Sequence, residues 1–172
     1  MKNTKKLLTW ILVAVLVVAT VALVACVDKP DVEQLNIRLP ELKDNQMAVI
    51  IMNGEDYTTY VVTLGEGGTD ATTAEGVLDY LVSKSGLSLT CSGSGSDKFI
   101  TSIGGISPNP NATNYEYIEI FTSNTAFHAT WAGATEYITA DGVTLKSASK
   151  GIHELGVTAG DVIYFQVSEY IM

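Results

Sequence analysis

Residue types that carry chemistry are few in this chain, and their spacing matches no common catalytic arrangement. The histidines, His128 and His153, lie in different segments, and the sequence has neither an H-E-x-x-H motif nor a cysteine–histidine ligand spacing. The stretch SGSGS at 92–96 lacks both the lysine of a P-loop and the setting of a nucleophile elbow. The one catalytic arrangement left open is a pair of carboxylates that meets only in the fold, as in glycosidases, and no spacing in the sequence indicates such a pair. We therefore expect no enzyme, no metal and no cofactor.

Another residue with a chemical role is Cys26, which follows an apolar N-terminal segment. Lys2, Lys5 and Lys6 come first, and residues 7–25 are almost wholly apolar. As a helix this segment would span roughly 28 Å, which is close to the hydrocarbon thickness of a bilayer. A basic start before an apolar run is typical of a membrane-inserting segment that exports the chain behind it.

The residues Leu23-Val24-Ala25-Cys26 resemble the lipobox of bacterial lipoprotein signal peptides. The resemblance implies that residues 1–25 are a cleaved signal peptide and that lipid is attached to the Cys26 sulfur. Two or more acyl chains would then anchor the protein stably. The alternative is a retained transmembrane helix with an unmodified Cys26. Both interpretations place the rest of the chain on the extracellular face of the cytoplasmic membrane.

Charge and cysteine content restrict the partners. The 172-residue chain has a net charge of −9. Without residues 1–25, seven basic residues remain against 19 acidic ones, which is a net charge of −12. Such a chain is repelled by nucleic acid, so we expect no nucleic-acid partner. With Cys26 lipidated, Cys91 has no disulfide partner, and we expect it to be a half-buried structural thiol.

The exported chain begins with a predicted tether and hairpin. Residues 26–46 are polar, contain Pro30 and Pro40, and show no periodicity, so they predict a lipidated cysteine followed by a flexible tether. The apolar run at 47–52 and the β-branched run at 57–64 predict two strands joined by the turn NGED.

A helix is predicted after the hairpin. Thr72 and Glu75 have the spacing of a capping box, and Gly86 is placed to end the helix. Between them, apolar residues recur on one helical face, namely Ala74, Val77, Leu78, Leu81 and Val82. We expect no other helix in the exported chain.

Strands dominate the second half of the sequence. The stretch YEYIEIFT predicts a strand with alternating faces. One face carries Tyr115, Tyr117 and Phe121 and the other carries Glu116, Ile118 and Ile120, so both faces have apolar area. Strands and one helix predict a single α+β domain over 47–172, with the helix on one side of a mixed sheet. The further predicted strands are 87–91, 99–103, 115–122, 137–139, 143–145 and 162–167.

Three stretches together resemble the transcobalamin-like C-terminal domain, a β-grasp-like module common on the surface of Gram-positive bacteria. They are TTAEGVLDYLVSKSGL, DKFITSIGGISPNPNATNYEYIEIFTSN and GVTLKSASKGIHELGVTAGDVIYF. The family's strand after the helix matches 99–106, its aromatic strand matches 115–124, and its closing strand matches 157–165. The chain departs from the pattern because its aromatic strand begins without tryptophan and a longer segment, 125–148, follows. The resemblance covers about residues 47–170 and implies a β-grasp-like fold.

The resemblance also implies extracellular binding of cobalamin or a related corrinoid, handed on to a transporter. An isolated domain of this kind would cover one face of such a ligand, so we expect modest affinity or a partner protein. The expected ligand-binding residues are exposed aromatics, which combine large contact area with a polar tip. They are Tyr115, Tyr117, Trp131 and Tyr137. The alternative role of each is to cover a half-solvated sheet face.

A second hypothesis is a surface protein–protein interaction or adhesion module without a small-molecule ligand. A tethered domain can bind a partner by strand addition or through an aromatic patch. The absence of a polar constellation suited to one small ligand favours this alternative. A concave pocket formed by the Trp131 loop over the tyrosines would favour a small molecule, and a flat face would favour a protein.

Overall fold

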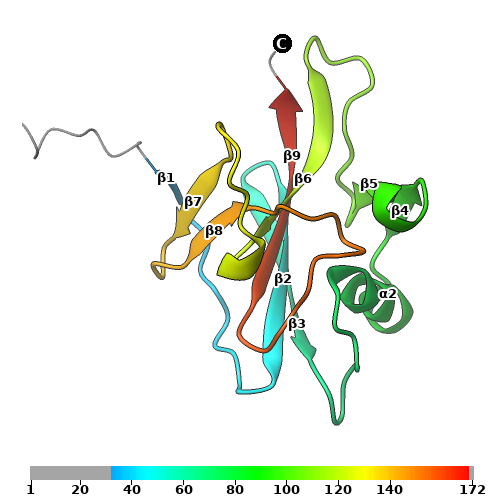
Figure 1. Cartoon of the computed structure of the whole chain (residues 1–172), viewed down its shortest axis with the longest axis vertical. Coiled ribbons are helices and arrows are strands. Elements are labelled where there is room, and N and C mark those ends of the chain that lie inside the picture. Colours follow the sequence, from blue (N-terminus) through cyan, green and yellow to red (C-terminus); the bar gives the residue numbers. More distant parts are fainter. Residues whose placement is uncertain (1–31, 171–172) are drawn as a thin grey trace, which may run out of the picture. The chain divides into compact units, whose positions relative to one another are not determined.

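The computed structural model describes residues 32–170, which form a mixed α+β fold with one large curled sheet and, within this range, one α-helix (Figure 1). The large sheet has the strand order β1-β7-β8-β6-β9-β2-β3, and β4 pairs with β5 in a second, two-stranded sheet. The predicted α+β class with a mixed sheet is confirmed. The strands are β1 (Glu33–Leu35), β2 (Gln46–Asn53), β3 (Asp56–Thr63), β4 (Leu89–Ser92), β5 (Phe99–Ile103), β6 (Tyr115–Thr122), β7 (Glu136–Thr139), β8 (Thr144–Ser147) and β9 (Val162–Tyr170), and two short 3-10 helices are η1 (Gly95–Asp97) and η2 (Thr125–Phe127).

Strand β9 organises the large sheet because it pairs with elements from both halves of the chain. It runs parallel to β2 and antiparallel to the full length of β6. Strands β2 and β3 form the predicted hairpin, in register from Gln46–Thr63 to Asn53–Asp56. The strands predicted at 47–52, 57–64, 99–103 and 115–122 are confirmed to within one residue at each end.

Helix α2 (Ala74–Ser85) is the predicted helix, but its first turn is capped differently. Thr73, rather than Thr72, is the N-cap residue, and its hydroxyl accepts a hydrogen bond of 3.4 Å from a backbone N–H of the first turn. Glu75 does not close a capping box, because its carboxylate binds side chains from other segments. Gly86 ends the helix as predicted, in the left-handed conformation with φ 67°.

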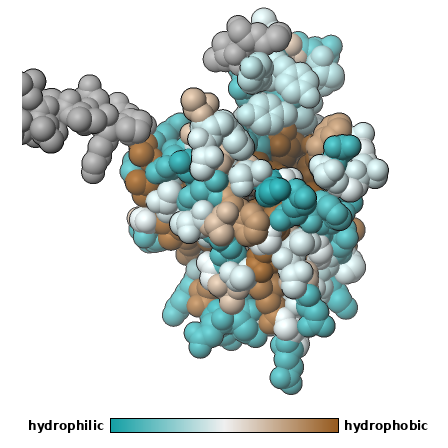
Figure 2. All heavy atoms as spheres, viewed as in Figure 1, coloured by the Kyte–Doolittle hydropathy of each residue, from teal (hydrophilic) through white to brown (hydrophobic). Residues whose placement is uncertain are grey.

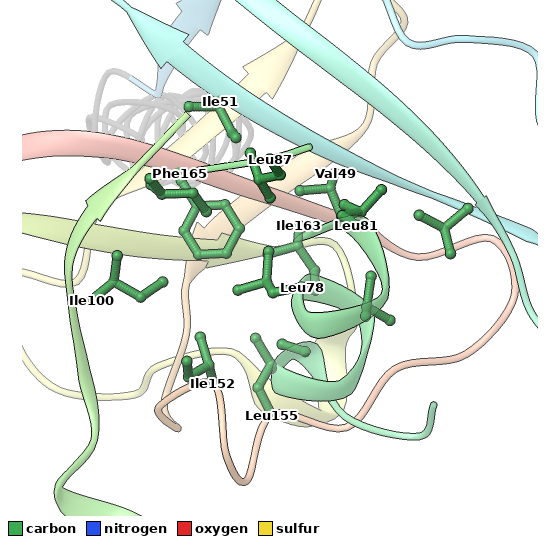
Figure 3. Close-up of a cluster of buried hydrophobic side chains, with 14 of the residues drawn as sticks. Val49, Ile51, Leu78, Leu81, Leu87, Ile100, Ile152, Leu155, Ile163 and Phe165 are labelled. Atoms are coloured by element: carbon green, nitrogen blue, oxygen red, sulfur yellow. The ribbon is translucent and has the colours of Figure 1, made fainter. Parts of the chain in front are cut away.

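The apolar stripe of α2 packs on one face of the large sheet and forms the larger of two cores. Figure 3 shows the Phe165 ring pointing from β9 toward Leu78 of the helix. Val82, predicted to lie on the packed face, is 41% exposed, so the buried stripe is narrower than the periodicity suggests. Fully burying one such side chain stabilises a fold by roughly 1.5–3 kcal/mol. The buried members include Val49, Ile51, Val77, Leu78, Leu81, Leu87, Ile100, Ile103, Ile152, Leu155, Ile163 and Phe165.

On the opposite face, strands from the two ends of the curled sheet pack against each other. Because the sheet curls, side chains of β7 and β8 pack against β2 and β9 on this face and form a second core. Three aromatic rings, those of Phe121, Tyr137 and Tyr164, lie together in this core. The other buried members are Ile37, Ala48, Ile50, Leu145 and Val162.

The domain begins earlier than the sequence indicated. Residues 26–46 were expected to form a tether, yet β1 pairs in parallel with β7, and Ile37 is fully buried in the second core. The Leu39 N–H also donates a hydrogen bond of 2.7 Å to the Asp141 carboxylate. This segment looked like a tether because its apolar residues bury against strands that are distant in sequence, which no local pattern reveals. In the structure the compact unit starts at Glu33 rather than at residue 47.

The predicted signal peptide over 1–25 and the lipidation of Cys26 lie outside the described residues. Within residues 32–170, no helix has the length and apolar character needed to cross a bilayer.

Candidate binding site

Strand β6 presents Tyr115 and Tyr117 on the same face, because successive side chains of a strand alternate. Across the β6–β9 pair, Tyr115 stands opposite Tyr170 and Tyr117 opposite Ser168. The rings of Tyr115 and Tyr117 are stacked, with centroids 6.5 Å apart and planes 16° from parallel. Tyr115 is 65% exposed. The two tyrosines therefore form an aromatic surface on which a flat ligand can stack.

A hollow of about 460 Å³ lies beside these rings. We call it the tyrosine hollow, and it is lined by Phe99–Thr101 of β5, Pro108–Pro110, and Ala112–Tyr117. Its size and its mixture of aromatic, proline and amide surfaces are typical of small-molecule sites.

Two hydrogen bonds hold the loop that walls this hollow. The Asn109 N–H donates to the Glu116 carboxylate at 2.6 Å, and Asn114 Nδ2 donates to Glu169 Oε2 at 3.0 Å. The loop is therefore tied to the strands β6 and β9 at both of its ends. Glu116 and Glu169 stand opposite each other and alternate with the tyrosines, so the loop is held on the other face of the strands and borders the hollow beside the rings. A border that is fixed before any ligand arrives lowers the entropic cost of binding.

A second hollow, of about 530 Å³, lies farther along β6. We call it the tryptophan hollow, because it contains Trp131, which is 55% exposed. Tyr117 lines both hollows, so they are neighbours along the strand. The loop that holds Trp131 thus stands beside Tyr117 and does not close over the tyrosine hollow. The lining residues are Tyr117–Ile120, Trp131–Gly133, Thr135, Ser147–Gly151 and Tyr170.

Tyr137, the fourth predicted ligand residue, does not line either hollow. It is 8% exposed and packs 5.1 Å, between ring centroids, from Phe121 in the second core. Its hydroxyl accepts a hydrogen bond of 2.9 Å from Gln166 Nε2, and burial raises the pKa of that hydroxyl. The expectation of an exposed ligand-binding side chain here is wrong, because the curl of the sheet turns β7 inward.

Phe99 and the proline–asparagine loop are site residues that the sequence reasoning missed. Phe99 is 57% exposed and stands at the start of β5. The stretch SPNPNATN, directly before the aromatic strand, was the available clue, since such loops carry function when a rigid scaffold positions them.

The polar groups of the hollows are amides, hydroxyls and carboxylates, together with the Lys150 ammonium in the tryptophan hollow. Burial, and then the nearby Glu119 carboxylate, raise the pKa of the Tyr117 hydroxyl, which therefore stays protonated and able to donate a hydrogen bond. Cys91 is half-buried, as predicted, and burial raises the pKa of its thiol. Across residues 32–170, no group of three or more His, Cys, Asp or Glu side chains is placed to hold a metal ion.

On the face shown in Figure 2, hydrophobic side chains occur in separate areas among hydrophilic ones. A single broad apolar patch would be typical of a large protein interface. Separate hollows with mixed lining suit smaller or extended ligands better.

A polar cluster apart from the hollows connects α2 to two loops. Glu75 binds the Lys98 ammonium through one carboxylate oxygen, and its other oxygen lies 2.7 Å from His153 Nδ1. The hydrogen bond from Lys98, followed by that from His153, lowers the pKa of Glu75. The cluster ties the helix to the segments before β5 and before β9, so its role is structural.

This cluster predicts a specific pH dependence of stability. Because the folded pKa of Glu75 lies below its ordinary value of 4.5, its charge stabilises the fold above that pH, and the contribution is lost as pH falls through the lowered pKa. We expect wild-type stability to fall more steeply than that of Glu75→Gln between about pH 5 and pH 3. Urea unfolding at several pH values measures this, with Asp79→Asn on the same helix as a control. Equal slopes for wild type and Glu75→Gln would contradict the assignment.

Comparison with known proteins assigns the chain to no family. No family model matches the sequence, and no curated protein matches it. One solved structure that matches part of the chain is a crystal structure of a "putative metal binding protein" from Ruminococcus gnavus. The two chains share 12% sequence identity at a TM-score of 0.49, over 74% of this chain and 99% of that chain.

Proposed function

We propose that this protein is a non-catalytic binding module on the extracellular face of the cytoplasmic membrane, and that its tyrosine hollow takes a small organic ligand. The observation that carries this proposal is the stacked pair Tyr115 and Tyr117, which lines an open hollow bordered by a loop that two hydrogen bonds hold in place. Stacked rings favour a flat ligand, and the amide-rich loop favours one with polar groups at its rim.

Cobalamin or a related corrinoid is the ligand we propose. A corrin is a broad, flat ring that carries amide groups around its rim, so it matches an aromatic wall beside an amide-bearing loop. The hollow is about 460 Å³ and open, which suits contact with one face of such a ring rather than enclosure. One-sided contact predicts modest affinity and leaves the other face free for a second protein.

We also propose that the domain is β-grasp-like and that a lipid anchors it to the membrane. A helix crossing a mixed sheet, followed by β5, β6 and β9 at the positions of the three resembling stretches, supports a β-grasp-like domain of the transcobalamin-like class. The lipobox-like residues 23–26 support a lipid anchor on Cys26. Exposed sites at the end of β6 would then face the extracellular medium.

Titration with cyanocobalamin and with dicyanocobinamide tests the site. Tyr115→Ala should weaken binding at least tenfold, about 1.4 kcal/mol, because it removes the more exposed half of the stacked pair. Tyr57→Ala, which truncates a 38% exposed tyrosine on β3, should change the affinity by less than about twofold. Equal affinities for the two variants would mean that the corrinoid binds elsewhere on the protein or does not bind at all.

A further inference from the structure

We propose that the outer edge of β6 accepts an extended, basic peptide segment of a partner protein as an additional strand. This inference goes beyond small-molecule binding, because it concerns backbone groups and the tryptophan hollow rather than the tyrosine hollow.

Strand β6 is paired along its full length on one side only. Its partner β9 covers residues from Tyr115 to Thr122, whereas β8 on the other side pairs only with Phe121 and Thr122. Within residues 32–170, no strand pairs with the outer side of β6 between residues 115 and 119. An exposed strand edge of this kind is a template for another strand.

The outward-facing backbone groups can be assigned from the pairing. In an antiparallel pair, each residue turns its N–H and C=O to the same side, and the side alternates along the strand. The Ile120 carbonyl accepts a hydrogen bond of 2.7 Å from the Ala148 N–H, which lies on the outer side. The β6–β9 register is unbroken. Ile118 and Glu116 therefore also turn their N–H and C=O groups outward.

The tryptophan hollow provides room for a strand at this edge. It is lined by the consecutive residues Tyr117–Ile120, whose side chains alternate between the two faces of the sheet. A hollow lined in this way follows the edge of the strand rather than one face. From Glu116 to Ile120 the edge extends about 13 Å, which matches a peptide of roughly five residues. Tyr117 and Trp131 offer apolar contacts to its side chains.

The charges at this edge define the occupant. Glu116 and Glu119 lie on the half-buried part of β6, where Glu116 accepts a hydrogen bond from the Asn109 N–H and Glu119 accepts one from the Ser147 hydroxyl. The whole chain has a net charge of −9. Lys150, which also lines the hollow, is paired with Glu154 at 3.1 Å. Electrostatic complementarity therefore favours a segment with Lys or Arg and disfavours a second copy of this acidic chain.

A seven-residue peptide that alternates lysine and valine, capped at both ends, tests the proposal without any corrinoid present. We expect saturable binding, with the largest ¹⁵N amide shifts at Glu116, Ile118 and Ile120. The same peptide with glutamate in place of lysine should bind at least tenfold more weakly. Because the assay contains no corrinoid, its failure leaves the proposed small-molecule function untouched.

N-methylation of the peptide separates strand addition from non-specific attraction. Methylating one alternate set of peptide amides should abolish binding, because that set faces β6, whereas methylating the other set should change affinity by less than about threefold. Equal effects of both sets, or no binding of the unmodified peptide at millimolar concentration, would overturn the proposal.

A matched pair of variants tests the same edge from the protein side. Ile118→Pro removes an N–H that points away from β9, whereas Ile118→Ala removes side-chain packing but keeps that N–H. We expect at least a tenfold loss of peptide affinity for the proline variant and less than a threefold loss for the alanine variant. A concentration-dependent dimer in sedimentation that Ile118→Pro abolishes would make a second copy the occupant and contradict the peptide proposal.

Discussion

Phe165→Ala is expected to lower the free energy of unfolding by about 4 kcal/mol. Phe165 lies on β9, the strand that joins β2 to β6, and it is fully buried between the sheet and α2. Its truncation removes a large apolar surface from the core and leaves a cavity that a central strand cannot collapse. Urea denaturation measures the loss as a lower midpoint with an unchanged slope.

Phe99→Ala is the matched control, since it deletes the same atoms from an exposed position. Phe99 is 57% exposed on β5, so its truncation should cost less than about 1 kcal/mol. A similar loss of stability in both variants would contradict the assignment of Phe165 to the main core.

Asp161→Ala is expected to cost about 3 kcal/mol. Asp161 is 9% exposed and precedes β9, and its Oδ2 accepts hydrogen bonds from the Thr158 N–H at 2.7 Å, the Thr158 hydroxyl at 3.1 Å and Asn124 Nδ2 at 3.0 Å. The substitution leaves these donors without their charged acceptor. Thermal or urea unfolding of the variant measures the cost.

Two further variants test whether the hydrogen bonds of the Asp161 carboxylate cause the loss of stability in Asp161→Ala. Asp161→Asn keeps one acceptor oxygen and should lose about half as much stability. Asp70→Ala, at an exposed position, should change stability by less than about 0.5 kcal/mol. Equal losses for Asp161→Ala and Asp70→Ala would show that the buried carboxylate does not hold the turn before β9.

Elements with strong local patterns were predictable from the sequence. The alternation in YEYIEIFT correctly separated Tyr115 and Tyr117 from Ile118 and Ile120, because a strand has a strict period of two. Helix α2 followed from its apolar stripe and from Gly86, although Thr73 rather than Thr72 proved to be its N-cap. In these elements the local sequence pattern agrees with the observed backbone geometry and with the observed burial of the side chains.

Elements that depend on distant partners were not predictable. The three-residue strand β1 and the buried Ile37 lack a period of their own and are ordered by β7 and the second core. Tyr137 lies in a strand that was recognised, but its burial depends on the curl of the whole sheet. A curl of this kind arises from the packing of both sheet faces and has no local sequence pattern.

The candidate site was predictable in part for the same reason. Tyr115 and Tyr117 followed from alternation within one strand, whereas the rest of the lining required β5 and the proline–asparagine loop to be placed beside β6. Trp131 was expected to be a ligand-binding residue, and whether its loop folds over the tyrosines was open; in the structure it lines the neighbouring hollow. Sequence patterns therefore identified the aromatic surface, and the fold supplied the concavity.

The proposed ligand-binding residues are exposed and the residues of the cores are buried, so binding and stability can be tested separately. Tyr115 and Trp131 are exposed, and their truncation should leave the unfolding curve nearly unchanged. Phe165 and Asp161 are buried and should affect folding without contacting a ligand. Loss of ligand binding in a fully folded Tyr115→Ala protein is thus attributable to the site.

Equilibrium dialysis of cyanocobalamin and cobinamide against a soluble protein that begins at Asp28 is the most direct test of corrinoid binding. We expect saturable binding of one corrinoid per chain in the roughly micromolar range, since the open hollow would contact one face of the ring. An absence of saturable binding by either corrinoid at high protein concentration would contradict it, and a protein partner on the cell surface would then become the function to pursue.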